Sequence, residues 1–78
     1  MSMKYVRGEE VGFILSPHTD RIWHSHVARV LREPVISAGF VRFVDGKPEC
    51  YGMSESLSVA SREGDSEALA KQLGLSAS

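Results

Sequence analysis

The sequence predicts an α+β fold, a two-layer sandwich in which a small, mostly antiparallel sheet of about three to five strands packs against two helices on one side. Three observations favour it. An Asp45-Gly46 turn separates two strand-like runs, an amphipathic segment lies between Pro17 and Pro34, and 78 residues suffice for one thin core. The expected order is strand, helix, three strands, helix. We expect a single domain over residues 4–75, with flexible ends at 1–3 and 76–78.

The first expected strand is the apolar run of residues 11–15, Val-Gly-Phe-Ile-Leu. Residues 4–7 form a candidate partner strand across the turn at 8–10. Ser16 and Pro17 then predict the start of a helix, because serine is a good N-cap and proline fits the first helical position. Pro34 ends this helix after Arg32 or Glu33.

The predicted helix has one apolar face and one basic face when residues are placed at steps of about 100°. His26 falls inside the apolar face, so we expect it to be at least partly buried. His24 lies at the margin of that face and His18 in the first turn, which predicts solvent exposure for both. The apolar face comprises Ile22, Trp23, Val27, Val30 and Leu31; the opposite face comprises Arg21, Ser25, Arg29 and Arg32.

Residues 35–44 and the chain after Asp45-Gly46 predict a β-hairpin with a two-residue type I′ turn. Pro48 then occupies a non-hydrogen-bonded position, which predicts a local edge of the sheet. The implied cross-strand pairs are Val44 with Lys47, Arg42 with Glu49, Val41 with Cys50, and Phe40 with Tyr51.

The C-terminal part predicts one more strand, at residues 57–61, and a final helix. Asp65 is the expected cap of this helix, which continues through Gln72, and Gly74 suits the left-handed residue after a helix end. The side chains expected to face inward are Ala68, Leu69, Leu73 and Leu75.

Composition and charge exclude several classes of protein. Nine Lys and Arg against ten Asp and Glu give a net charge of −1, without the basic excess typical of a nucleic-acid module. Cys50 is the single cysteine and cannot form an internal disulfide, so we expect a cytoplasmic location. The polar start and the lack of a long apolar run predict neither secretion nor a membrane partner. No dinucleotide, phosphate-loop or paired Cys-x-x-Cys motif is present, so no cofactor is expected.

The three histidines invite a metal or catalytic interpretation. His24 and His26 are about 200° apart on a helix and His18 lies further along it, so no metal site is predicted. A core histidine is the favoured reading of His26, and a general base is the alternative. Cys50 is favoured as a packing residue; the alternative is a nucleophile activated by His26, with nearby hydroxyl groups from Ser37, Ser54 or Ser56.

A basic stripe on the outer face of the first helix is the candidate anion or nucleic-acid site. It consists of Arg21, Arg29 and Arg32, with His18 near its beginning. A solvated helix face is the commoner explanation, because Asp20 flanks the stripe and no aromatic side chain is interleaved for base stacking.

The aromatic content exceeds what one helix face can cover, which predicts that one sheet face is an interface or a shallow pocket. The favoured function is therefore a non-enzymatic binding or oligomerisation module whose partner is a second copy or another protein. The alternatives are nucleic-acid or phosphate binding through the basic stripe, and a small hydrolase or transferase that uses His26 and Cys50.

Several short runs carry a family resemblance: Ser37-Ala38-Gly39-Phe40-Val41, then Cys50-Tyr51-Gly52 with Ser54, Ser56 and Leu57, then Ser61-Arg62 with Asp65. With these runs the chain resembles a group of small uncharacterised proteins encoded by bacteria and by their phages or prophages, over most of residues 11–73 and with His18 before the helix. The resemblance implies an accessory protein of mobile-element origin. It carries over no activity and no site residue.

Overall fold

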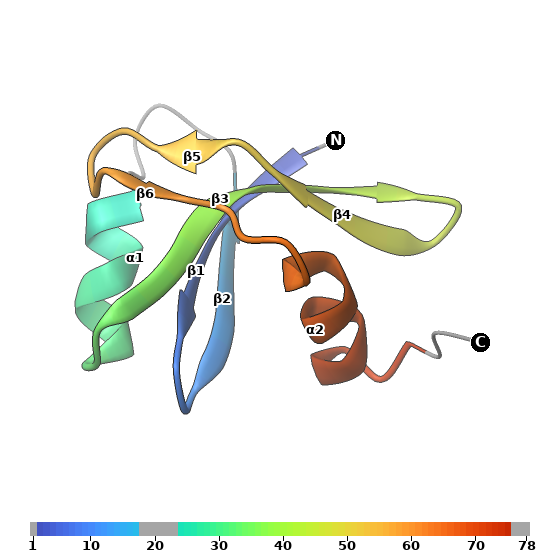
Figure 1. Cartoon of the computed structure of the whole chain (residues 1–78), viewed down its shortest axis with the longest axis horizontal. Coiled ribbons are helices and arrows are strands. Elements are labelled where there is room, and N and C mark those ends of the chain that lie inside the picture. Colours follow the sequence, from blue (N-terminus) through green and yellow to red (C-terminus); the bar gives the residue numbers. More distant parts are fainter. Residues whose placement is uncertain (1, 18–23, 76–78) are drawn as a thin grey trace.

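The computed structural model describes residues 2–17 and 24–75 of the chain. Six strands and two helices follow one another in these residues (Figure 1). Their order is β1 (Ser2–Gly8), β2 (Gly12–Pro17), α1 (His24–Leu31), β3 (Val35–Val44), β4 (Lys47–Tyr51), β5 (Met53–Ser54), β6 (Val59–Ala60) and α2 (Asp65–Gln72).

Four strands form one antiparallel sheet in the order β2-β1-β3-β4, and β5 pairs with β6 in a second, two-stranded sheet. The α+β class is therefore confirmed. The predicted pairing of residues 4–7 with the strand after them is also correct, but β1 starts earlier than expected. Ser2 and Met3 belong to it, whereas we expected residues 1–3 to be a flexible end.

The β3–β4 hairpin has the predicted register at every paired position from Val44 with Lys47 to Phe40 with Tyr51. Asp45 and Gly46 have φ angles of 53° and 79°, as a type I′ turn requires. β4 is an edge strand, which confirms the prediction made from Pro48. The register of this hairpin could be predicted because the two-residue turn sets which residues of β3 and β4 face each other.

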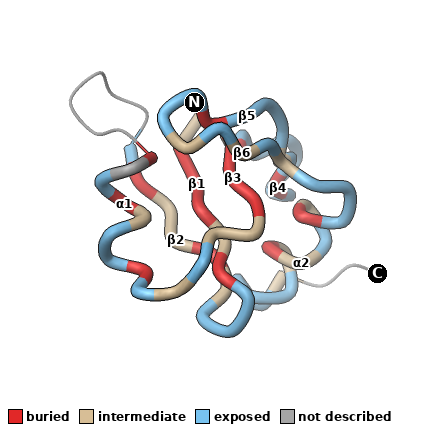
Figure 2. Tube along the Cα trace, turned by 60° about the vertical axis from the view of Figure 1, so that its left-hand side comes forward, coloured by how far each residue is buried: buried red, intermediate tan, exposed pale blue. Residues whose placement is uncertain are grey.

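The two helices cover opposite faces of the sheet, so the expectation that both lie on one side is wrong (Figure 1). Adjacent residues of β1 point to opposite faces. Accordingly Val6 packs with Val27 of α1, whereas Tyr5 packs with Leu69 of α2. The central strands β1 and β3 are apolar on both faces, and each face requires its own cover. Figure 2 shows the buried residues along these two strands.

The predicted start of the first helix is wrong. Ser16 and Pro17 continue β2, where they pair with Lys4 and Met3 of β1. Pro17 is tolerated because β2 is an edge strand and the Met3–Pro17 pair needs no N–H from Pro17. Residues 18–23 lie outside the described part of the chain, and with them the predicted positions of His18, Arg21, Ile22 and Trp23.

The described part of α1 ends one residue early, because Arg32 adopts a left-handed φ of 58°. Val27 and Leu31 are buried as predicted. Val30 is not, since 70% of its surface is exposed. Its place in the predicted apolar face is therefore wrong.

α2 ends at Gln72 as predicted but begins one residue earlier than expected, and Gly74 has the predicted left-handed conformation with a φ of 75°. Leu69 is fully buried, whereas Leu73 is 44% exposed and does not face inward as expected. Gly64 holds the N-cap position, so Asp65, the expected cap, is instead the first helical residue. Of the strand expected at residues 57–61, the structure forms Val59–Ala60 as β6.

Candidate functional site

One face of the β3–β4 hairpin carries exposed apolar side chains that neither helix covers. Alternation along the strands places Phe40, Val44 and Tyr51 on the sheet face that carries α1. On this face α1 packs against β1, β2 and β3, and β5 and β6 lie against β3, while side chains on the β4 side remain partly exposed. Val44 is 43% exposed, Tyr51 38% and Met53 of the adjoining β5 47%. We call these four residues the aromatic surface.

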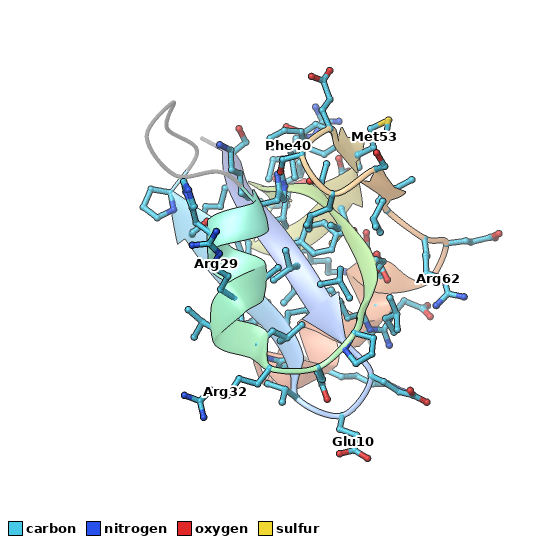
Figure 3. All side chains as sticks on the ribbon, turned by 90° about the vertical axis from the view of Figure 1, so that its left-hand side faces the viewer. Glu10, Arg29, Arg32, Phe40, Met53 and Arg62 are labelled. Carbon is cyan, nitrogen blue, oxygen red and sulfur yellow. The ribbon has the colours of Figure 1, made fainter. Side chains whose placement is uncertain are left out.

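The aromatic surface is held in place by ring contacts and an ion pair. The Phe40 and Tyr51 ring centroids are 5.9 Å apart. The Arg42 guanidinium lies 5.2 Å from the centre of the Tyr51 ring, and its Nε donates to Glu49 Oε1 at 2.9 Å. Figure 3 shows Phe40 and Met53 at the same end of the molecule. Because these groups are ordered by contacts within the chain, a partner would find the surface already formed.

His24 supports the aromatic surface from beneath, and this contradicts the prediction for the histidines. His24 is 4% exposed; its Nε2 lies 2.6 Å from Gly39 O, and its ring meets Phe40 edge-on at 5.3 Å. His26, which we expected to be buried, is exposed. The buried residues of α1 are His24, Val27 and Leu31, so the inward face of the helix differs from the one predicted by helical periodicity.

A buried ionic cluster lies on the opposite face of the sheet, beneath α2. Asp65 is fully buried, and its carboxylate accepts hydrogen bonds from Tyr5 Oη at 2.6 Å, Arg7 Nη1 at 2.8 Å and the Arg62 backbone N–H at 3.0 Å. Burial acts to raise the pKa of Asp65, but the hydrogen bonds from Tyr5, Arg62 and Arg7 outweigh it and hold the pKa below its ordinary value. Burial and the neighbouring carboxylate raise the pKa of Tyr5. The cluster fixes α2 to the sheet and offers no open position for a substrate.

The structure places Cys50 beside this cluster and does not bring it to His26. Cys50 is half-buried on the face that α2 covers, and its backbone N–H donates to Ser66 Oγ at 2.8 Å. Burial raises the pKa of the thiol to about 11. His26 belongs to α1, on the other face of the sheet. The dyad required for a Cys–His nucleophile is not formed.

The serines considered as hydroxyl partners for Cys50 lie in a turn or in the core. Ser54 Oγ accepts from the Leu57 backbone N–H at 3.2 Å and lies 3.3 Å from Ser56 Oγ, as expected for a turn. Ser37 is fully buried, and among the described residues no group is placed to form a hydrogen bond with Ser37 Oγ.

Part of the predicted basic stripe is visible. Arg29 is exposed on α1, and Arg32 is exposed just beyond its end (Figure 3). The left-handed turn at Arg32 takes it off the helix, so the two side chains do not continue one helical stripe. Arg21 and His18 fall outside the described residues.

The described ranges 2–17 and 24–75 contain neither a metal-ligating cluster nor a membrane-spanning helix. Within them, no group of three or more His, Cys, Asp or Glu side chains is placed to hold a metal ion. In the same ranges, no helix has the length and apolar character needed to cross a membrane.

Comparison with known proteins gave no match. No protein-family model, no curated protein and no solved structure matches the chain.

The residues that matter most were only partly accessible to sequence reasoning. The cross-strand pair of Phe40 and Tyr51 follows from the hairpin register, and its exposure follows from the edge position of β4. The Asp65 cluster was missed, because Tyr5 and Arg7 are about sixty residues away along the chain. The residues around Asp65 in the sequence indicated only a helix cap, and nothing in them predicted that its carboxylate would be buried.

Proposed function

We propose that the protein is a non-enzymatic binding or oligomerisation module that acts through protein–protein contacts at the aromatic surface. The observation that carries this proposal is the exposure, at 38–47%, of Val44 and Tyr51 on the hairpin and of Met53 in the adjoining β5. Interfaces are enriched in aromatic residues, methionine and arginine, and large exposed apolar groups in a small domain mark contact sites.

The chemistry of the surface fits a protein partner. Arg42 lies over the Tyr51 ring and forms an ion pair with Glu49. These two charged side chains give the apolar residues a polar rim, as is typical of protein–protein interfaces. The partner in this proposal is a second copy or another protein in the cytoplasm. A thin core gives a chain of this size a further reason to associate.

The state of Cys50 supports a binding function over a thiol-dependent reaction. With a pKa of about 11, the thiol is protonated at neutral pH, whereas a nucleophilic cysteine needs a lowered pKa. Slow alkylation of Cys50 by iodoacetamide at pH 8, with fast alkylation after denaturation, is the expected result. Equal rates in the folded and denatured protein would favour the hydrolase or transferase alternative instead.

The proposal is tested by the mass of the assembly. Native mass spectrometry and sedimentation velocity are expected to show a metal-free oligomer of the wild-type chain, and the double variant Tyr51→Ser, Met53→Ser is expected to weaken it at least about tenfold. Val11→Ser is the matched control, since Val11 is 58% exposed in the turn between β1 and β2. A monomer that carries the mass of a nucleotide or metabolite would contradict the proposal.

Nucleic-acid or phosphate binding stays as a second candidate because Arg29 and Arg32 are both exposed. It predicts salt-sensitive binding of a fluorescent oligonucleotide that weakens when Arg21, Arg29 and Arg32 are replaced by Gln. Unchanged binding in the triple variant would end this candidate. The resemblance to small phage and bacterial proteins extends the proposal to an accessory protein of mobile-element origin.

A further inference from the structure

α2 bonds to the backbone of both edge strands of the four-stranded sheet. At the start of the helix, Ser66 Oγ accepts from the backbone N–H of Cys50 in β4 at 2.8 Å. At its end, the side-chain amide of Gln72 accepts from the Phe13 N–H at 2.8 Å and donates to the Phe13 C=O at 3.0 Å in β2. β4 and β2 are the outer strands of the sheet, so one helix closes hydrogen-bonding groups on both edges.

The Gln72 amide takes the place of one residue in a neighbouring strand. Such a residue would offer one C=O and one N–H to the outward-facing groups of Phe13, and the amide offers the same two. Gly12 makes room for it, because a Cβ at residue 12 would collide with Gln72 Oε1. The contact is therefore a side-chain imitation of strand pairing.

The rest of the β2 edge is short and uncharged. Backbone groups alternate in direction along a strand, so Leu15 and Pro17 turn the same way as Phe13. Pro17 has no N–H to offer. The strand carries no charged side chain from Gly12 to Pro17, although charges are a common protection of exposed edges. Within residues 2–17 and 24–75, this edge is protected by Gln72 and Pro17.

We propose that Gln72 reversibly blocks strand pairing at the β2 edge. When its amide leaves Phe13, β2 pairs antiparallel with β2 of a second copy. A two-fold axis at Ile14 sets Phe13 opposite Leu15 of the second copy and the reverse. Each of these pairs forms two backbone hydrogen bonds, so the dimer replaces the two bonds that Gln72 makes in each copy and also gives partners to the outward groups of Leu15. No charges oppose one another in this arrangement.

The Gln72 side chain can leave Phe13 with little rearrangement of the rest of α2. Gln72 is an exposed residue at the last turn of α2, and the burial of α2 rests on Leu69 and Asp65 further back. The β2 edge also lies at the opposite side of the sheet from the aromatic surface. The inference is therefore independent of the proposed function, and failure of either leaves the other standing.

The test compares Gln72→Met with Lys71→Met, an exposed neighbour that carries the same new side chain. Methionine keeps the length and helix propensity of Gln72 but cannot bond to Phe13. Sedimentation equilibrium should show dimerisation at least about tenfold tighter for Gln72→Met than for the wild type and for Lys71→Met. Hydrogen exchange of the Leu15 amide should slow at least about tenfold in the dimer, because its outward N–H becomes bonded.

Equal association of Gln72→Met and Lys71→Met would overturn the proposal. Tighter association without protection of the Leu15 amide would also overturn it, since the copies would then meet elsewhere, for instance at the aromatic surface. If circular dichroism shows that Gln72→Met has lost the fold, Gln72→Ala is measured against Lys71→Ala by the same two criteria.

Discussion

Asp65 is the residue on which the attachment of α2 most depends. Its carboxylate has no exposed surface and joins Tyr5 and Arg7 of β1 to the segment before α2. A charge at such depth is stable only when its hydrogen bonds are complete. The cluster therefore selects one docking position for the helix as well as holding it.

Replacement of Asp65 by Asn should lower the free energy of unfolding by about 3 kcal/mol at pH 7, because Arg7 and Tyr5 lose their charged acceptor. Urea denaturation measures the difference. Glu67→Gln is the control, since Glu67 is exposed on the same helix and its replacement should change stability by less than about 0.5 kcal/mol. Similar losses in both variants would contradict a specific role for Asp65.

The same cluster predicts a dependence on acid. The pKa of Asp65 is lowered in the folded protein, so its contribution is complete above the ordinary value of 3.8 and is lost as the pH falls through the lower folded value. The difference in unfolding free energy between the wild type and Asp65→Asn should therefore shrink below about pH 4. A difference that stays constant from pH 7 to the acid limit would argue against an ionised Asp65 in the folded state.

The two described histidines should behave differently although they are two positions apart. His24→Ala should cost about 2 kcal/mol, because it leaves Gly39 O without its hydrogen bond and removes the ring contact with Phe40. His26→Ala should change stability by less than about 0.5 kcal/mol, since His26 is exposed. Thermal unfolding of both variants provides the comparison. A larger loss of stability in His26→Ala than in His24→Ala would support the orientation of α1 predicted from helical periodicity.

At the level of elements, local chemistry decided which predictions succeeded. The β3–β4 hairpin was predictable residue by residue, because Asp45 and Gly46 fix the turn and the turn fixes the register. Ser16 and Pro17 carried an equally local signal for a helix start, yet pairing with β1 extends β2 through them. Tertiary pairing overrode the capping preference there, and no pattern within the segment could have revealed it.

Gly39 illustrates a requirement that sequence does not reveal. A Cβ at this position would lie 2.5 Å from the backbone oxygen of Tyr51, where the chain leaves β4. Gly39→Ala should therefore force β3 and the end of β4 apart and cost about 3 kcal/mol. Urea denaturation, with hydrogen exchange of β4 amides, would detect the loss of stability and of pairing.

Gly46→Ala is the control for Gly39→Ala. Its φ of 79° makes alanine strained, but no atom lies within 4 Å of the added Cβ. The expected cost is about 1 kcal/mol from the backbone alone. If Gly39→Ala were no more harmful than Gly46→Ala, the close approach of Tyr51 would not be a constraint on the folded chain.

At the scale of the whole molecule, the sheet is a central layer with a helix on each face. Sequence reasoning placed both helices on one face, because it treated the apolar content of β1 and β3 as excess surface for an interface. Part of that apolar content, including Tyr5 and Val41, is covered by α2. The aromatic surface along β4 remains exposed, and so does Phe43, which is 44% exposed on the opposite face of the same hairpin, so helix cover accounts for only part of the excess.

The two halves of the core should unfold together, because Tyr5 and Val6 are adjacent in β1 yet belong to different halves. Leu69→Ala should cost about 3 kcal/mol and Val27→Ala about 2 kcal/mol. In a domain whose total stability is about 4–12 kcal/mol, either loss should lower one shared transition, seen alike by tyrosine fluorescence and by circular dichroism. Hydrogen exchange decides the matter. If Leu69→Ala lowers the protection of α2 amides while α1 amides keep wild-type protection, the two helices unfold independently. Equal loss of protection in both helices is the result expected for a shared central strand.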